Sequence, residues 1–219
     1  MADTRLTIRA AAGCLVAASF TACAPGQTAE APAPRAEAQR IDAGASFSDH
    51  GWGKLTSQRF FLSLPLPDAR EWHVDDTSGR WLAATHLPSK SMLWVRSWRE
   101  GAVVNHAACE AAARSYRPDL LGHDEAALAD RRPLGAPDGF DTEVGFSVSR
   151  NKGALGGVAA AFGARVRQCL VIIYATRADG PDAEELVADR VGFVVDRVFS
   201  RVESRTIDDR VVPLAPRGR

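Results

Sequence analysis

The segment 165–176 constrains the fold of this chain more than any other. It contains the run Cys169-Leu170-Val171-Ile172-Ile173-Tyr174, in which every side chain is apolar or aromatic. Successive side chains of a strand point to opposite faces of a sheet, so a strand without polar positions needs cover on both sides. The sequence therefore predicts a central strand here, with packed structure on each face of its sheet.

Five other segments have the composition of strands and complete the predicted sheet. They are 59–64, 81–86, 92–98, 140–148 and 158–162, and in the clearest of them apolar residues occupy alternate positions. Pro65 and Pro67 are expected to end the first of these strands, because proline cannot donate to a ladder. Hairpin turns are predicted at 87–90 and at Gly163-Ala164, and a flexible turn at 151–157.

Two helices are predicted among these strands. Asn105 is a suitable N-cap for a helix that Pro118 ends. Residues 119–138 are rich in Asp, Gly, Pro and Arg and predict either a long loop or a short helix followed by a loop. A second helix is predicted over 181–204. Pro181 suits its first turn, acidic residues follow there, and valines recur at helical spacing.

The predicted order is β-β-β-α-β-β-β-α, an α+β domain whose helices pack on an antiparallel sheet of about six strands. This pattern resembles the PsbP-like and DcrB-like α/β/α sandwich. The features that match are Phe60-Phe61-Leu62-Ser63-Leu64-Pro65, Trp72, the Cys109 helix, the strand with Cys169 and Tyr174, and the closing amphipathic helix. Over about 55–204, the resemblance implies an accessory, binding or assembly protein without an active site.

The first 22 residues predict export from the cell. Arg5 and Arg9 are followed by an uncharged run of small and apolar residues over 10–20. This run is about 11 residues long, too short for a membrane-spanning helix of roughly 20. A basic start, a short apolar middle and small residues before a cleavage point are typical of a secretory signal peptide.

The sequence Phe20-Thr21-Ala22-Cys23 resembles the lipobox of bacterial lipoproteins. The resemblance implies that Cys23 is acylated, with palmitate among its lipids, and becomes the new N-terminus. The protein would then be anchored to the inner or outer membrane and face the periplasm. Cleavage after Ala24, giving a soluble secreted protein, and retention inside the cell are the alternatives.

Four segments follow from this interpretation: a signal peptide (1–22), a tether rich in Pro and Ala (23–46), one α+β domain (47–204) and a flexible tail (205–219). A stretch so poor in large apolar residues as 23–46 cannot build a core. Proline-rich linkers are extended and semi-rigid. The tether is therefore expected to hold the domain away from a membrane surface.

Charge and cysteines limit the possible functions. The 27 basic and 27 acidic residues cancel, which gives no electrostatic case for a nucleic-acid partner.

Cys109 and Cys169 are a pair in a protein predicted to be exported, so a disulfide is expected, with two buried thiols as the alternative. His106 lies three residues before Cys109 on the predicted helix, so a less favoured hypothesis is a Cys/His enzyme.

Trp94, Arg96 and Trp98 share one face of a predicted strand and are the candidate binding face. Tryptophan interleaved with arginine is typical of interface hot spots, although burial of the tryptophans in the core is the alternative. Neither a metal site nor a cofactor is expected. The sequence favours a membrane-anchored, non-catalytic module that binds an envelope protein, with a carrier of a small apolar ligand as the second hypothesis.

Overall fold

The computed structural model describes residues 47, 51–116, 128–135 and 137–204. Cys23, the predicted signal peptide, the tether and the C-terminal tail lie outside the described residues. The described residues belong to one compact unit. They form an α+β domain with two antiparallel sheets.

The larger sheet has seven strands in the spatial order β3-β4-β5-β9-β8-β7-β6, and every neighbouring pair is antiparallel. Its strands are β3 (Trp72–Asp75), β4 (Leu82–His86), β5 (Ser91–Arg99), β6 (Ala129–Leu134), β7 (Asp141–Asn151), β8 (Ala154–Arg165) and β9 (Gln168–Ala178). The smaller sheet has the order β1-β2-β10 and consists of β1 (Gly53–Ser57), β2 (Leu62–Leu66) and β10 (Glu203–Ser204).

Strand β9 lies at the centre of the large sheet, between β5 and β8, as its apolar composition predicts. Leu170, Ile172 and Tyr174 project to one face, and Val171 and Ile173 project to the other. All five side chains are buried. The two clusters that they enter are the two halves of the core, so the sheet is covered on both sides.

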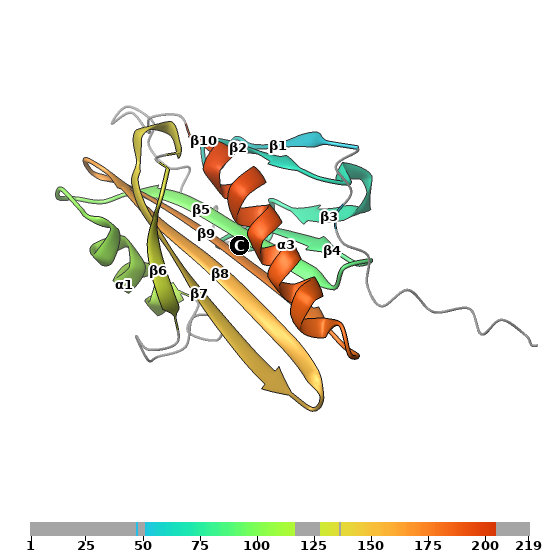
Figure 1. Ribbon diagram of the computed structural model, residues 1–219. Helices are drawn as coiled ribbons and strands as arrows, with labels where there is room; N and C mark the ends of the chain where they lie inside the picture. The colour runs from blue at the N-terminus through green and yellow to red at the C-terminus, as the bar shows by residue number, and fades with distance from the viewer. Residues whose placement is uncertain (1–46, 48–50, 117–127, 136, 205–219) are drawn as a thin grey trace, which may run out of the picture. The chain divides into compact units, whose positions relative to one another are not determined.

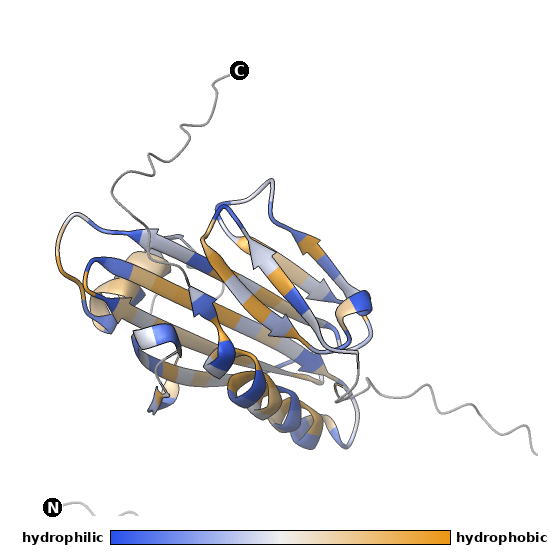
Figure 2. Cartoon of the chain, turned by 90° about the horizontal axis from the view of Figure 1, so that it is seen from above, coloured by the Kyte–Doolittle hydropathy of each residue, from blue (hydrophilic) through white to orange (hydrophobic). Residues whose placement is uncertain are grey.

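A different layer covers each face of the large sheet (Figure 1). Helix α3 (Ala183–Arg197), the 3-10 turn η4 (Phe199–Arg201) and β2 pack on the face that we call the α3 face. Helix α1 (His106–Tyr116) packs on the opposite face, the α1 face, through Ala113. Figure 2 shows hydrophobic bands along the strands that lie between these layers.

The start of α1 agrees with the sequence prediction. The side-chain oxygen of Asn105 accepts a hydrogen bond from the backbone N–H of Ala108, at 2.9 Å. This contact satisfies one of the amide donors that the first turn of a helix leaves free, so Asn105 is the N-cap. The predicted end of the helix at Pro118 lies outside the described residues.

The α+β class is confirmed, but the predicted order β-β-β-α-β-β-β-α and the single sheet of about six strands were wrong. The described strands number ten in two sheets, and β1, β3, β6 and β10 carry little strand signal of their own. Strand β6 was assigned to a loop, and five of its six side chains are exposed. The interval 151–157 contains only a tight turn, with β8 beginning at Ala154. The helix predicted over 181–204 ends at Arg197, and η4 and β10 follow it.

One predicted turn and one predicted strand end were also wrong. The β8–β9 reversal is not at Gly163-Ala164: β8 continues to Arg165, and Val166 adopts a positive φ of 55° in the turn. Pro65 does not end its strand, since β2 extends to Leu66. Beyond Leu62 and Ser63, β2 pairs only with β1 among the described strands, so a residue without an N–H is tolerated there.

Candidate functional site

The predicted binding face lies on the α1 face of β5, where Trp94, Arg96 and Trp98 stand opposite residues of β9. Trp94 is 5% exposed and packs in the core cluster that includes Trp81 and Phe162. It therefore cannot form part of an exposed binding surface, and its role in the predicted face is corrected to core packing. Arg96 and Trp98 are partly exposed.

Arg96 is held by aromatic rings. Its guanidinium carbon lies 4.3 Å from the ring centre of Tyr116 and 5.5 Å from that of Trp98. Trp98 in turn donates its indole N–H to the Glu100 carboxylate at 2.6 Å. Burial lowers the pKa of Arg96, yet cation–π contact offsets part of the cost of desolvation. The cation therefore joins α1 to β5, and its Nε and Nη1 atoms are buried there.

The disulfide predicted between Cys109 and Cys169 is present and joins α1 to β9. Both cysteines are fully buried, beside Trp98 and Val104. A sulfur engaged in a disulfide cannot act as a thiolate nucleophile. The Cys/His enzyme hypothesis for Cys109 and His106 therefore loses its nucleophile in this oxidised state.

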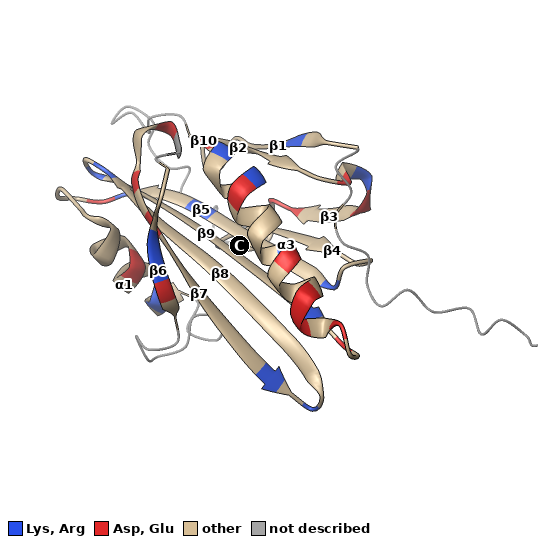
Figure 3. Ribbon diagram, viewed as in Figure 1, with Lys and Arg blue, Asp and Glu red and all other residues tan. Residues whose placement is uncertain are grey.

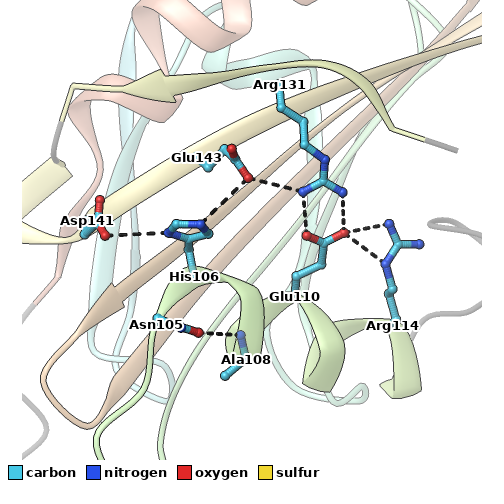
Figure 4. Close-up of polar contacts among 8 residues, drawn as sticks. All are labelled: Asn105, His106, Ala108, Glu110, Arg114, Arg131, Asp141 and Glu143. Atoms are coloured by element: carbon cyan, nitrogen blue, oxygen red, sulfur yellow. Dashed lines mark hydrogen bonds and ion pairs between the residues drawn. The ribbon is translucent and has the colours of Figure 1, made fainter. Parts of the chain in front are cut away.

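His106 belongs instead to a charged network between α1, β6 and β7 (Figure 4). Its ring nitrogens lie 3.6 Å from Asp141 and 4.0 Å from Glu143. Nearby, Glu110 accepts hydrogen bonds from Arg114 at 2.6 Å and from Arg131 at 2.7 Å. Burial by itself would raise the pKa of Glu110, but the two arginines outweigh it and lower this pKa.

This charged network holds α1 against β6 and β7. Arg131 also reaches Glu143 at 3.2 Å, so one guanidinium bridges the helix and the sheet. Removing one partner from a buried ion pair of this kind strongly destabilises the folded protein, because the other charge is left buried without compensation. Among the described residues, no group of three or more His, Cys, Asp or Glu side chains is suited to hold a metal ion. The contacts of Glu110 and Arg131 explain how α1 is held against β6 and β7.

A second polar cluster lies in the core on the α3 face. Ser89 is 2.7 Å from the Nδ1 atom of His86, and Ser91 links Ser89 to the Tyr174 hydroxyl through contacts of 2.8 Å each. Arg190 donates to the Ser89 carbonyl at 3.0 Å. Ser89 is completely buried, so a substrate cannot reach this Ser–His contact. Sequence reasoning missed the cluster, because no spacing marks residues brought together by β4, β5, β9 and α3.

An apolar groove lies between α3 and the hairpin of β7 and β8 and has a volume of about 500 Å³. Its apolar lining residues are Phe146, Val148, Leu155, Val158, Val187, Ala188 and Val191. Val148 is 67% exposed, which is unusual for a valine that faces a core helix. Arg150 and Glu184 also line the groove, and Figure 3 shows the basic end of β7.

Gly157 sets the floor of this groove. It stands opposite Val148 in the hairpin, and a Cβ atom there would lie 2.4 Å from Val187 of α3. The missing side chain lets the N-terminal half of α3 approach β8 closely. Beyond that contact, β7 lies one strand further out, so Val148 remains open to solvent.

Comparisons with known proteins give no family for this chain. No family model matches it, and no curated protein matches it. A crystal structure from Bacteroides thetaiotaomicron VPI-5482 shares 10% sequence identity, with a TM-score of 0.44. The match covers 70% of this chain and 48% of that chain, so this chain spans about half the length of the matched protein.

In the part of the chain that the structure describes, no helix has the length and apolarity needed to span a bilayer.

Proposed function

We propose that this protein is a non-catalytic binding module of the bacterial cell envelope, anchored to a membrane by lipid on Cys23. The buried Cys109–Cys169 disulfide supports this proposal. Persistent disulfides belong to oxidising compartments such as the periplasm, where a signal peptide at 1–22 would send the chain. The helix on each face of the antiparallel sheet is also the layering that the PsbP-like and DcrB-like resemblance implies.

The groove between α3 and the β7–β8 hairpin is the proposed recognition site, and its apolar lining, with Val148 exposed at the mouth, is the observation that carries the proposal. Contiguous exposed apolar surface on a monomer commonly marks an interaction site. Three aliphatic side chains, Val148, Val187 and Val191, line this groove from both of its walls. The partner is therefore expected to insert an apolar group between helix and hairpin.

A carrier of a small apolar ligand is the second candidate, and the volume of the groove favours it. About 500 Å³ falls within the range of roughly 300–1,000 Å³ that is typical of small-molecule sites. The groove also lies between the sheet and a helix, where a carrier would hold its ligand. A small molecule that remains bound to the purified protein in native mass spectrometry would favour this candidate over an envelope protein.

A charge placed in the groove tests the proposal. Val148→Asp is expected to weaken binding of the apolar fluorophore N-phenyl-1-naphthylamine at least about tenfold, because the bound fluorophore would have to remove water from a carboxylate, at a cost above about 1.4 kcal/mol. Val103→Asp is the control, since Val103 is also exposed, at 76%, but does not line the groove. Equal binding by the two variants, or no saturable binding by the natural chain, would contradict the proposal.

A further inference from the structure

Strand β7 extends beyond its outer neighbour in the sheet. The pairing of β6 with β7 runs from Leu134 opposite Thr142 to Ala129 opposite Phe146. On its inner side, β7 stays paired with β8 without a register shift as far as Asn151. Among the described strands, none pairs with the outer edge of 147–151.

The described residue that precedes β6, Leu128, does not extend the ladder along this edge. Leu128, the residue preceding β6, packs into the cluster on the α1 face with Trp94 and Phe162. Its side chain lies directly beside Gly145, where a Cβ atom would be 3.1 Å away. Leu128 thus lies under the sheet and does not continue the ladder along β7.

The open edge has two different faces. Phe146, Val148 and Arg150 alternate on the α3 face, next to the apolar groove. Ser147 and Ser149 occupy the positions between them and project to the α1 face. A strand added along this edge would therefore place every second side chain beside the groove.

Charge indicates what such a strand would carry. Arg150 takes part in none of the ion pairs found among the described residues, and Lys152 follows it in the turn. Two copies of this chain joined at this edge would bring two Arg150 and two Lys152 side chains to one seam, which repulsion disfavours. A partner with an acidic residue at this position is favoured instead.

We propose that the outer edge of 147–151 accepts an extended peptide segment of a partner protein as an additional antiparallel strand. This inference rests on the proposed function and specifies its ligand. The peptide places an apolar side chain opposite Val148 and an acidic one opposite Arg150. Because the strands run antiparallel, the acidic residue comes two positions before the apolar one, giving the pattern acidic-x-apolar. Exposed sheet edges are common sites for such strand addition.

Labelled synthetic peptides test the proposal by fluorescence anisotropy with the full chain. Acetyl-Ser-Glu-Thr-Val-Thr-Thr-amide is expected to bind at least about tenfold more tightly than acetyl-Ser-Val-Thr-Glu-Thr-Thr-amide, which has the same composition in the reverse order. N-methylation of alternate peptide bonds should abolish binding, since it removes backbone donors and leaves the side chains in place. Val103→Asp should leave binding unchanged.

A charge reversal completes the test. Arg150→Glu is expected to reject the Glu-x-Val peptide and to bind the corresponding Lys-x-Val peptide. No peptide binding, equal binding of all peptides, or self-association of the chain that Arg150→Glu removes would overturn the proposal. The peptide and fluorophore experiments can fail independently. If the peptide experiments fail but the natural chain binds N-phenyl-1-naphthylamine and Val148→Asp does not, strand addition is rejected and the groove remains a binding site.

Discussion

His86 is the described histidine most strongly affected by its surroundings. It is 3% exposed, and its ring centre lies 5.1 Å from that of Trp72 and 5.2 Å from that of Phe47. Its Nδ1 atom lies 2.7 Å from the Ser89 hydroxyl oxygen and accepts a hydrogen bond from the backbone N–H of Ser89 at 3.3 Å. Burial is the main cause that lowers the pKa of His86. The folded protein therefore holds this ring neutral.

A pH dependence of stability follows from this burial. The unfolded chain takes up a proton near the usual histidine pKa of about 6.5, whereas the folded chain does so only at lower pH, so acid favours unfolding. Between pH 7 and 5 the free energy of unfolding should fall, by at most about 1.4 kcal/mol per pH unit from this group. The free energy of unfolding, measured by urea denaturation at each pH, should depend less on pH in His86→Asn than in the natural protein. An equal pH dependence in both proteins would show that His86 is not responsible.

Two glycines with opposite surroundings test the packing of α3 on the sheet. Gly157→Ala places a Cβ atom 2.4 Å from Val187, so it should destabilise the domain by about 1–3 kcal/mol. Gly192→Ala, on α3 itself, meets no atom within 4 Å and should stabilise by about 0.5–1 kcal/mol through helix propensity. Thermal unfolding followed by circular dichroism measures both, and a Gly157→Ala protein as stable as the natural one would contradict the close approach of α3.

The elements that could be predicted are those whose own side chains determine their structure. Strand β9 has apolar residues on both faces, and Asn105 has the side chain of an N-cap, so both were found from the sequence. Strand β6 contains Pro133 and is mostly exposed, so only its pairing with β7 makes it a strand. Such pairing depends on residues that are distant in the chain, and the sequence of the segment does not encode it.

The candidate site shows the same limit. Val148 belongs to the alternating pattern of β7, and by that pattern it is indistinguishable from the buried Val144. Its exposure arises because β7 extends past β6 and lies one strand beyond β8, the strand on which this part of α3 packs. Conversely, Trp94 and Trp98 share one face of β5, yet Trp94 is buried with Trp81 and Trp98 is partly open. The exposure of these side chains therefore could not be predicted from the sequence, because the tertiary structure determines it.

We propose that this chain combines membrane targeting with a binding domain. A signal peptide at 1–22, a lipid on Cys23 and a proline-rich tether would hold the domain near a membrane, with its groove available to partners there. The disulfide between Cys109 and Cys169 fits the oxidising side of that membrane. Export and acylation are thus the central claim, because the proposed partner is a component of the envelope.

Mass spectrometry of the protein isolated from the membranes of producing bacterial cells, without reduction, tests this claim most directly. We expect a mature chain that begins at an acylated Cys23 and has lost two hydrogen masses through the Cys109–Cys169 bond. A chain that retains Met1 and carries free thiols at Cys109 and Cys169 would contradict it.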